Sequence, residues 1–318
     1  MSSVVDTVVV EFTRDITLYS ACLGHDLSTG KLVCADVFRA ERGQWAKVHS
    51  GMLDLLVPGC AKDPFAPPGE PAAEVPERSA DPVPRTAYRQ PSQVGKMHIH
   101  GGPESQARPA YSALFQCLLA NGIAVMAPNV RGSTGYGFAW QKRIYLDWGG
   151  VDLADFEAGA EYLKTLDWID PDRMAVMGQS YGGFAALSCL TRLPDLWAAG
   201  ISLYGPANLE TLARSMPPGW ATTVATMFGD PDKDAQRMQE RSPVTYAHQI
   251  SAPLLVIQGA NDRRVPKAEA DQIVAAARAN HAEVDYLVFS DEGHGFTTRN
   301  NGIKAQTTVV DFLTKHLQ

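Results

Sequence analysis

The sequence is poor in cysteine and has neither a long basic run nor a long apolar run, and each absence excludes a class of protein. Its five cysteines are widely spaced and form no CxxC pair, so we expect free thiols in a reducing compartment. No block of Lys or Arg suggests a nucleic-acid or anionic-membrane surface, and the net charge is −7. No apolar run approaches the length that spans a bilayer. The start, MSSVVDTVVVEFTRD, lacks the basic region and apolar core of a secretion signal, so we expect a cytoplasmic protein.

What is present is enough sequence for one large α/β domain, in three regions of different composition. The chain has 318 residues, of which 45% are hydrophobic and 20% charged. Residues 1–57 carry β-rich runs, and we expect them to join the central sheet or to pack on it. Residues 58–92 hold nine of the 21 prolines and predict a surface loop, because proline-rich chain forms neither helix nor central strand. Residues 93–318 form the third region, the expected catalytic domain.

This third region alternates between short apolar strands and amphipathic helices. Apolar strands that are separated by helices predict a mostly parallel central sheet with helices on both faces. Residues 206–250 interrupt the alternation and predict a helical insertion. The expected strands are 97–100, 123–127, 173–177, 199–204, 254–258 and 284–289, and the expected helices are 111–121, 152–165, 184–192, 267–279 and 306–317.

The strongest local signal is the sequence GQSYGG at 178–183, which contains GxSxG. It follows an apolar strand and precedes a helix of small residues, the setting that a nucleophile elbow requires. In such an elbow a strained turn exposes the serine, here Ser180, and glycines flank it where side chains would collide. The alternative is an ordinary serine in a glycine-rich turn.

Two downstream residues fit the partners that a nucleophilic serine needs. A serine hydroxyl becomes nucleophilic when a histidine takes its proton, and a carboxylate holds that histidine in place. Asp262 and His294 each follow a predicted strand, in the order Ser, Asp, His of α/β-hydrolases. Taken singly, Asp262 could be a turn residue and His294 a loop histidine. Together with Ser180 they predict a catalytic triad.

Stabilisation of a tetrahedral oxyanion requires hydrogen-bond donors near Ser180. One candidate is the amide of Tyr181, and the other lies in the turn formed by His100, Gly101 and Gly102. His98 and His100 share a strand face, but no third metal ligand is evident, so we expect no metal. No GxGxxG follows an early strand, and we expect no cofactor.

Six separated motifs resemble the prolyl oligopeptidase family of serine peptidases, and most of all its acylaminoacyl-peptidase and dipeptidyl-peptidase-like branches. The resemblance covers roughly residues 95–318 and implies an α/β-hydrolase fold. It also implies hydrolysis of short peptides or acylated amino acids by Ser180, Asp262 and His294. The motifs are HGGPESQ at 100–106, NVRGSTGYG at 129–137, GQSYGGF at 178–184, Ser242-Pro243, GANDRRVP at 259–266 and EGHGF at 292–296.

The chain departs from that family in three respects. Fewer than a hundred residues precede HGGP, which is too few for the β-propeller that family members usually carry before the hydrolase domain. The acidic residues that read a substrate's amino terminus lie on that propeller and cannot be carried over. Relatives with Tyr-Gly-Gly at the first strand's end use the tyrosine hydroxyl as an oxyanion donor. Here His100 takes that place, so the second donor is either its side chain or a backbone amide.

Substrate-binding candidates follow the strands or lie in the insertion. Arg131 could bind a substrate carboxylate or carbonyl, or could form a salt bridge with Asp147 or Asp152. Tyr204 ends a strand near the expected site and could serve catalysis or packing. A second set, which could line an acyl pocket or form the insertion's own core, is Met216, Pro217, Trp220, Met227 and Phe228. The insertion and the 58–92 segment are the candidate substrate gates.

Three functions are compatible with these residues. The first is a serine hydrolase that cleaves a short peptide or an acyl-amino acid. The second is an esterase, thioesterase or lactonase, including a tailoring hydrolase of small-molecule biosynthesis. The third is an inert binding protein that retains the fold, against which the intact triad argues. The expected partner is a small-molecule substrate, and the sequence leaves homo-oligomer formation open.

Overall fold

The computed structural model describes residues 93–318 apart from Pro109, and the backbone of short strands between residues 6 and 47. The predicted loop at 58–92 lies outside the described residues, as do all side chains before Val94. No helix in the described part of the chain is both long enough and apolar enough to cross a membrane.

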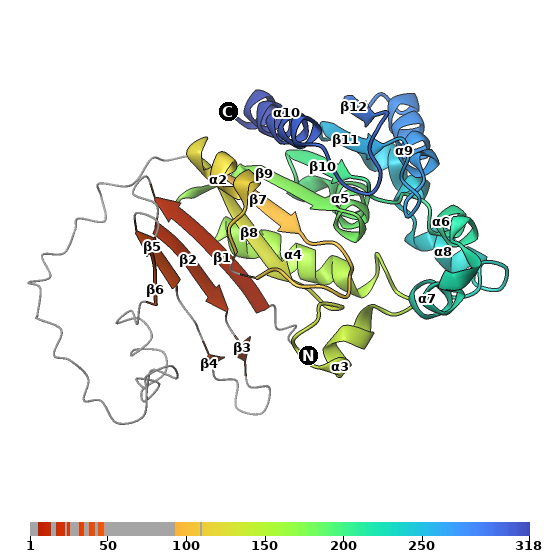
Figure 1. Cartoon of the computed structure of the whole chain (residues 1–318), viewed down its shortest axis with the longest axis horizontal. Coiled ribbons are helices and arrows are strands. Elements are labelled where there is room, and N and C mark those ends of the chain that lie inside the picture. Colours follow the sequence, from red (N-terminus) through yellow and green to blue (C-terminus); the bar gives the residue numbers. More distant parts are fainter. Residues whose placement is uncertain are drawn as a thin grey trace, which may run out of the picture.

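An eight-stranded sheet organises the chain, in the order β12-β11-β10-β9-β7-β8-β1-β2 (Figure 1). Six neighbouring strands are parallel, which confirms the predicted architecture. β1 pairs antiparallel with β8, and β2 pairs antiparallel with β1. The parallel strands are β7 (Gln93–Ile99), β8 (Ile123–Asn129), β9 (Ile169–Gln179), β10 (Ala199–Leu203), β11 (Leu254–Gly259) and β12 (Val284–Phe289). The others are β1 (Asp6–Thr13), β2 (Thr17–Cys22) and two small hairpins, β3 (Gly24–His25) with β4 (Leu32–Cys34) and β5 (Phe38–Glu41) with β6 (Gln44–Lys47).

Helices cover both faces of this sheet and give the domain two apolar core clusters. On one face lie α2 (Ala113–Ala120) and α10 (Arg299–Leu317), whose buried side chains belong to one of these clusters. On the other lie α4 (Val151–Lys164), α5 (Tyr181–Arg192) and α9 (Lys267–Ala279). Every residue of β10 and β11 is buried, as expected for strands covered on both sides.

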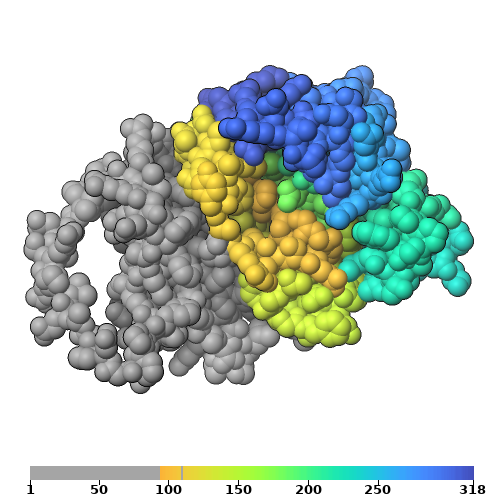
Figure 2. All heavy atoms as spheres, in the orientation of Figure 1, coloured from red at the N-terminus to blue at the C-terminus, as the bar shows by residue number. Residues whose placement is uncertain are grey.

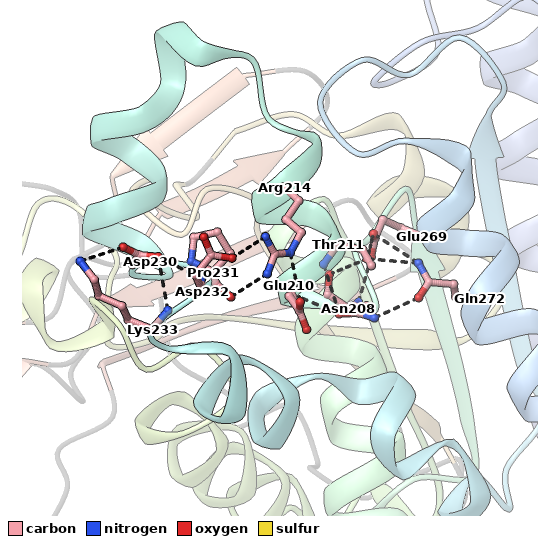
Figure 3. Close-up of polar contacts among 10 residues, drawn as sticks. All are labelled: Asn208, Glu210, Thr211, Arg214, Asp230, Pro231, Asp232, Lys233, Glu269 and Gln272. Atoms are coloured by element: carbon pink, nitrogen blue, oxygen red, sulfur yellow. Dashed lines mark hydrogen bonds and ion pairs between the residues drawn. The ribbon is translucent and has the colours of Figure 1, made fainter.

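The predicted insertion is helical. Three helices and two 3-10 turns make it up: α6 (Leu209–Ser215), η4 (Pro218–Trp220), α7 (Ala221–Met227), α8 (Ala235–Arg241) and η5 (Pro243–Gln249). Inside it, Arg214 on α6 pairs with Glu210 and Asp232 and donates to the carbonyl of Pro231 (Figure 3). Glu269 on α9 accepts from the amide of Asn208 at 2.8 Å, so the insertion is joined to the domain where it begins.

Several element boundaries differ from prediction, among them those of β7 and β9, which begin at Gln93 and Ile169 rather than at 97 and 173. α10 begins at Arg299 rather than 306, and its early part contains Asn300, Asn301 and Gly302, poor helix formers that concealed it. α5 begins directly after Ser180, three residues before the predicted start, because glycines depress the local helix signal. A short helix, α3 (Phe138–Gln141), followed by the 3-10 turn η2 (Lys142–Ile144), was not predicted.

Candidate active site

Ser180 lies in a tight turn between β9 and α5, in a backbone conformation that is unusual for a residue with a side chain. Its φ is 57° and its ψ is −120°. A Cβ atom on Gly182 would lie 2.0 Å from the carbonyl oxygen of Ile99, and one on Gly178 would lie 2.3 Å from Gly182. The glycines of GxSxG are therefore required because β7, the turn and the first turn of α5 approach one another too closely for a methyl group.

The three side chains predicted to meet do so. His294 Nε2 lies 2.9 Å from Ser180 Oγ, and His294 Nδ1 lies 2.7 Å from Asp262 Oδ2. The other carboxylate oxygen of Asp262 accepts from the amides of Arg264 at 2.8 Å and Val265 at 2.9 Å. With the Asp262 carboxylate as acceptor, Nδ1 of His294 carries the hydrogen and Nε2 is left to accept from the serine hydroxyl.

Sheet topology brings these residues together from distant parts of the sequence. Each of them follows the carboxyl end of a parallel strand: Ser180 after β9, Asp262 after β11 and His294 after β12. Loops at these ends of neighbouring strands gather on one edge of the sheet. Figure 2 shows a hollow in the surface where the segments near residues 100, 180 and 290 meet, with the insertion at its rim.

Glu292, which sequence reasoning did not single out, holds the loop that carries His294. This buried carboxylate accepts from the amide and hydroxyl of Thr297 at 2.8 and 2.7 Å and from those of Thr298 at 3.0 and 2.8 Å. Asn301 also donates to it at 2.8 Å. These hydrogen bonds, with the Thr297 amide first, hold the pKa of Glu292 well below its usual range. Two threonines a few residues after the glutamate were the available sequence signal.

The backbone and the side chain of Tyr181 have different surroundings. Its amide is the first of α5, where a helix leaves its N–H groups without an intrahelical acceptor. Its side chain is buried, and its hydroxyl donates to Asp152 at 2.7 Å on α4. Desolvation by burial raises the pKa of Asp152 to about 6. The side chain therefore anchors the elbow to α4, and only the backbone of Tyr181 remains for oxyanion binding.

The turn 100–102 lies beside the nucleophile. A Cβ atom on Gly101 would lie 3.5 Å from the Cβ of Ser180. Gly102 has φ +126°, a conformation that favours glycine. His100 Nδ1 lies 2.7 Å from the carbonyl of Gly101, so Nδ1 carries the hydrogen. His100 Nε2, at 2.8 Å from Ser133 Oγ, then accepts from that hydroxyl. Burial lowers the pKa of His100 and favours this neutral ring, which has no second N–H to donate.

Arg131 forms a salt bridge, but the predicted partners were wrong. Its guanidinium contacts Asp155, with Nη2 2.8 Å from Oδ1, and its amide donates to Oδ2 at 2.8 Å. Asp147 pairs instead with Arg241 at 2.8 Å, and Asp152 receives Tyr181. Helix α4 turns Asp155, rather than residues at its start, toward Arg131. This geometry favours the structural interpretation of Arg131 over substrate binding.

The remaining substrate-binding candidates are found in different surroundings. Tyr204 lies against the catalytic histidine candidate, with ring centroids of Tyr204 and His294 4.8 Å apart. Desolvation by burial, with the charge of Asp262 second, raises the pKa of Tyr204 to about 12. Phe228 is 5% exposed and packs edge-on against Trp148, which lies outside the insertion, so its ring packs between the insertion and the rest of the domain. Trp220 is 40% exposed. The described part of the chain contains no group of three or more His, Cys, Asp or Glu side chains suited to a metal.

Comparisons with known proteins agree with this geometry. A sequence model of the prolyl oligopeptidase family matches residues 109–318. Dipeptidyl aminopeptidase BIII of Pseudoxanthomonas mexicana is 41% identical over 224 residues, which are 69% of this chain and 32% of the relative. The acylamino-acid-releasing enzyme of Rattus norvegicus is 29% identical over 205 residues, 62% of this chain and 28% of the relative.

Solved structures give the same result for the fold. The acylaminoacyl peptidase of Pyrococcus horikoshii superposes with a TM-score of 0.67 at 25% identity, over 71% of this chain and 38% of that one. A puromycin-hydrolyzing peptidase of Mycobacterium tuberculosis matches with a TM-score of 0.67 at 24% identity, over 95% of this chain and 47% of that one. The chain spans about a third of the length of the curated relatives it matches.

Proposed function

Because this chain belongs to the prolyl oligopeptidase family of serine peptidases, we propose that it hydrolyses the amide bond of a short peptide or an acylated amino acid. The observation that carries the proposal is the position of one imidazole. His294 lies within hydrogen-bond distance of the Ser180 hydroxyl through Nε2 and of the Asp262 carboxylate through Nδ1. An imidazole between a hydroxyl and a buried carboxylate can take a proton and return it, which is what acyl transfer needs.

The reaction proceeds in two steps through an acyl-enzyme. Ser180 Oγ attacks the carbonyl carbon while His294 Nε2 takes the hydroxyl proton. Asp262 stabilises the imidazolium, and the C–O bond of a tetrahedral intermediate forms. His294 then gives the proton to the leaving amine as the C–N bond breaks. A water molecule attacks the resulting ester, its proton passes to His294, and the return of that proton to Ser180 Oγ releases the acid.

The oxyanion is held by backbone amides in this proposal. The amide of Tyr181 is one donor, and an amide of the turn at Gly101 and Gly102 is the other. The hydrogen bonds of His100 support this choice, since its ring donates its only N–H to the carbonyl of Gly101. A side-chain donor at position 100, which the sequence left open, would require the other tautomer.

Hydrolysis of chromogenic substrates tests the proposal. Purified protein is assayed with aminoacyl, dipeptidyl and acyl-aminoacyl p-nitroanilides and with p-nitrophenyl esters, beside Ser180→Ala. We expect anilide turnover that falls by about four to six orders of magnitude in the variant. Turnover of esters but of no anilide would favour an esterase instead. Absence of all turnover by the unmodified protein, or equal turnover by both proteins, would contradict the proposal.

A further inference from the structure

Glu104 lies at the rim of the candidate active site, next to the turn that flanks the nucleophile. A Cβ atom on Gly101 would lie 3.5 Å from the Cβ of Ser180, and one on Gly102 would lie 2.7 Å from the amide nitrogen of Glu104. Gly101 therefore lies beside the nucleophile, and the chain turns tightly between Gly102 and Glu104. Figure 2 shows the segment near residue 100 beside the hollow, with the segment near residue 140 next to it at the rim.

The carboxylate of Glu104 is exposed and yet held in place from across the rim. Gln141, the last residue of α3, donates its side-chain amide to Glu104 Oε1 at 2.6 Å. The hydroxyl of Tyr145, which follows η2, donates to the same oxygen. This hydrogen bond raises the pKa of Tyr145. Two neutral donors on one neighbouring segment thus fix an acidic group that would otherwise sample many rotamers.

No cation neutralises this group within the part of the chain that the structure describes. The salt bridges formed by residues 94–318 do not include Glu104, and its second oxygen has no hydrogen-bond partner among them. The basic residues nearest in sequence are Lys96, which is buried and contacts His98 and Met177, and the exposed Arg108, which forms no salt bridge within residues 94–318. A fixed carboxylate with one free oxygen is suited to a protonated amine.

The distance from Ser180 limits where that amine can lie in a substrate. An extended peptide advances about 3.3 Å per residue, so an amino terminus one or two residues before the scissile bond lies within about 7 Å of it. Glu104 is three residues beyond Gly101, so its backbone lies at most about 11 Å from that of Gly101, and we expect its side chain to reach an amine in this range. The relatives named above comprise a dipeptidyl aminopeptidase and an acylamino-acid-releasing enzyme, whose names imply a free and a blocked amino terminus respectively.

We infer that Glu104 binds the free α-ammonium group of a peptide substrate, one or two residues before the scissile bond, and thereby selects unblocked over acylated amino termini. This inference rests on the proposed peptidase function and names the substrate class of the same site. Gln141 and Tyr145 act as positioning residues for the carboxylate. The selective contact is supplied by this domain itself.

Glu104→Gln tests the inference, because it removes the charge and keeps an oxygen that can accept from Gln141 and Tyr145. The substrates are alanyl-alanine p-nitroanilide and its N-acetyl derivative. For the free substrate we expect kcat/KM to fall about tenfold, through a rise in KM, as for loss of a charge-assisted hydrogen bond. For the acetylated substrate it should be unchanged. Added salt should raise KM for the free substrate in the unmodified protein and have less effect in the variant. Glu161→Gln, the same change on the exposed face of α4, is the control.

Equal losses for both substrates would show that Glu104 only anchors the rim and would overturn the inference, as would no change for either. A binding measurement separates this outcome from failure of the proposed function. Alanyl-alanine amide is titrated by calorimetry into Ser180→Ala and into Ser180→Ala with Glu104→Gln. The inference predicts about tenfold weaker binding to the double variant, whether or not the protein hydrolyses anilides. Equal binding to the two proteins contradicts it.

Discussion

Replacing Asp152 with asparagine should change how the stability of this protein depends on pH. Asp152 is buried in the first turn of α4, directly beneath the nucleophile elbow. Its Oδ2 accepts from the Tyr181 hydroxyl at 2.7 Å and from the Gly149 amide at 3.2 Å, whereas Oδ1 has no partner in the described part of the chain. Desolvation outweighs these hydrogen bonds and raises the pKa from 3.8 to about 6.

The sign and size of the effect follow from this shift. Between pH 3.8 and about 6 the folded protein holds a proton on Asp152 that the unfolded chain has lost. The free energy of unfolding therefore falls as the pH rises through this window and stays low above it. At about 1.4 kcal/mol per pKa unit, ionisation of Asp152 costs on the order of 3 kcal/mol of stability at neutral pH.

Urea unfolding from pH 4 to pH 7.5 measures this cost. In Asp152→Asn the free energy of unfolding should fall less across the range, by on the order of 2 to 3 kcal/mol, because the amide does not titrate. Asp311→Asn, an exposed aspartate on α10, is the control and should follow the unmodified protein. Parallel curves for the unmodified protein and Asp152→Asn would refute the reasoning, whatever their vertical offset.

Three further substitutions test other parts of the site. Gly182→Ala should prevent stable folding, because its methyl would lie 2.0 Å from the carbonyl oxygen of Ile99. A thermal melt followed by circular dichroism that is identical to that of the unmodified protein would contradict this. Asp262→Asn should lower kcat by about 10⁴-fold while the protein stays folded, since the amide favours the wrong tautomer of His294. A near-normal kcat would show that Asp262 does not orient the histidine. Glu292→Gln should lower both the melting temperature and kcat, because an amide cannot accept from all the donors that the carboxylate satisfies. The melting temperature is measured by fluorimetry and kcat by anilide hydrolysis, and unchanged values of both would rule out a supporting role.

Much of the fold could be predicted because the strands are apolar and short and the helices amphipathic. The site could be predicted because acyl transfer requires a fixed set of groups in a fixed chain order. Ser180, Asp262 and His294 follow β9, β11 and β12 in that order, and parallel strands present their carboxyl ends at one edge. The glycine spacing around Ser180 reflects close contacts of Gly178 with Gly182 and of Gly182 with Ile99.

Contacts that depend on the direction of one side chain could not be predicted. Arg131 pairs with Asp155 rather than Asp152 because the rotation of α4 about its axis decides which of these aspartates faces Arg131, whereas Asp147 precedes α4 and pairs with Arg241. The tautomer of His100 depends on the direction of its ring, which places Nδ1 at the carbonyl of Gly101 and Nε2 at Ser133, more than thirty residues away. Glu292 appeared only as a neighbour of His294, since its five hydrogen bonds form after the loop folds.

Labelling with a fluorophosphonate tests most directly whether Ser180 is a nucleophile activated by His294. The protein is treated with the probe, its intact mass is followed over time, and the adduct is located by peptide mapping. We expect one adduct per chain, on Ser180, absent in Ser180→Ala and formed much more slowly in His294→Gln. An adduct on another residue, or labelling of Ser180→Ala at the rate of the unmodified protein, would contradict the account.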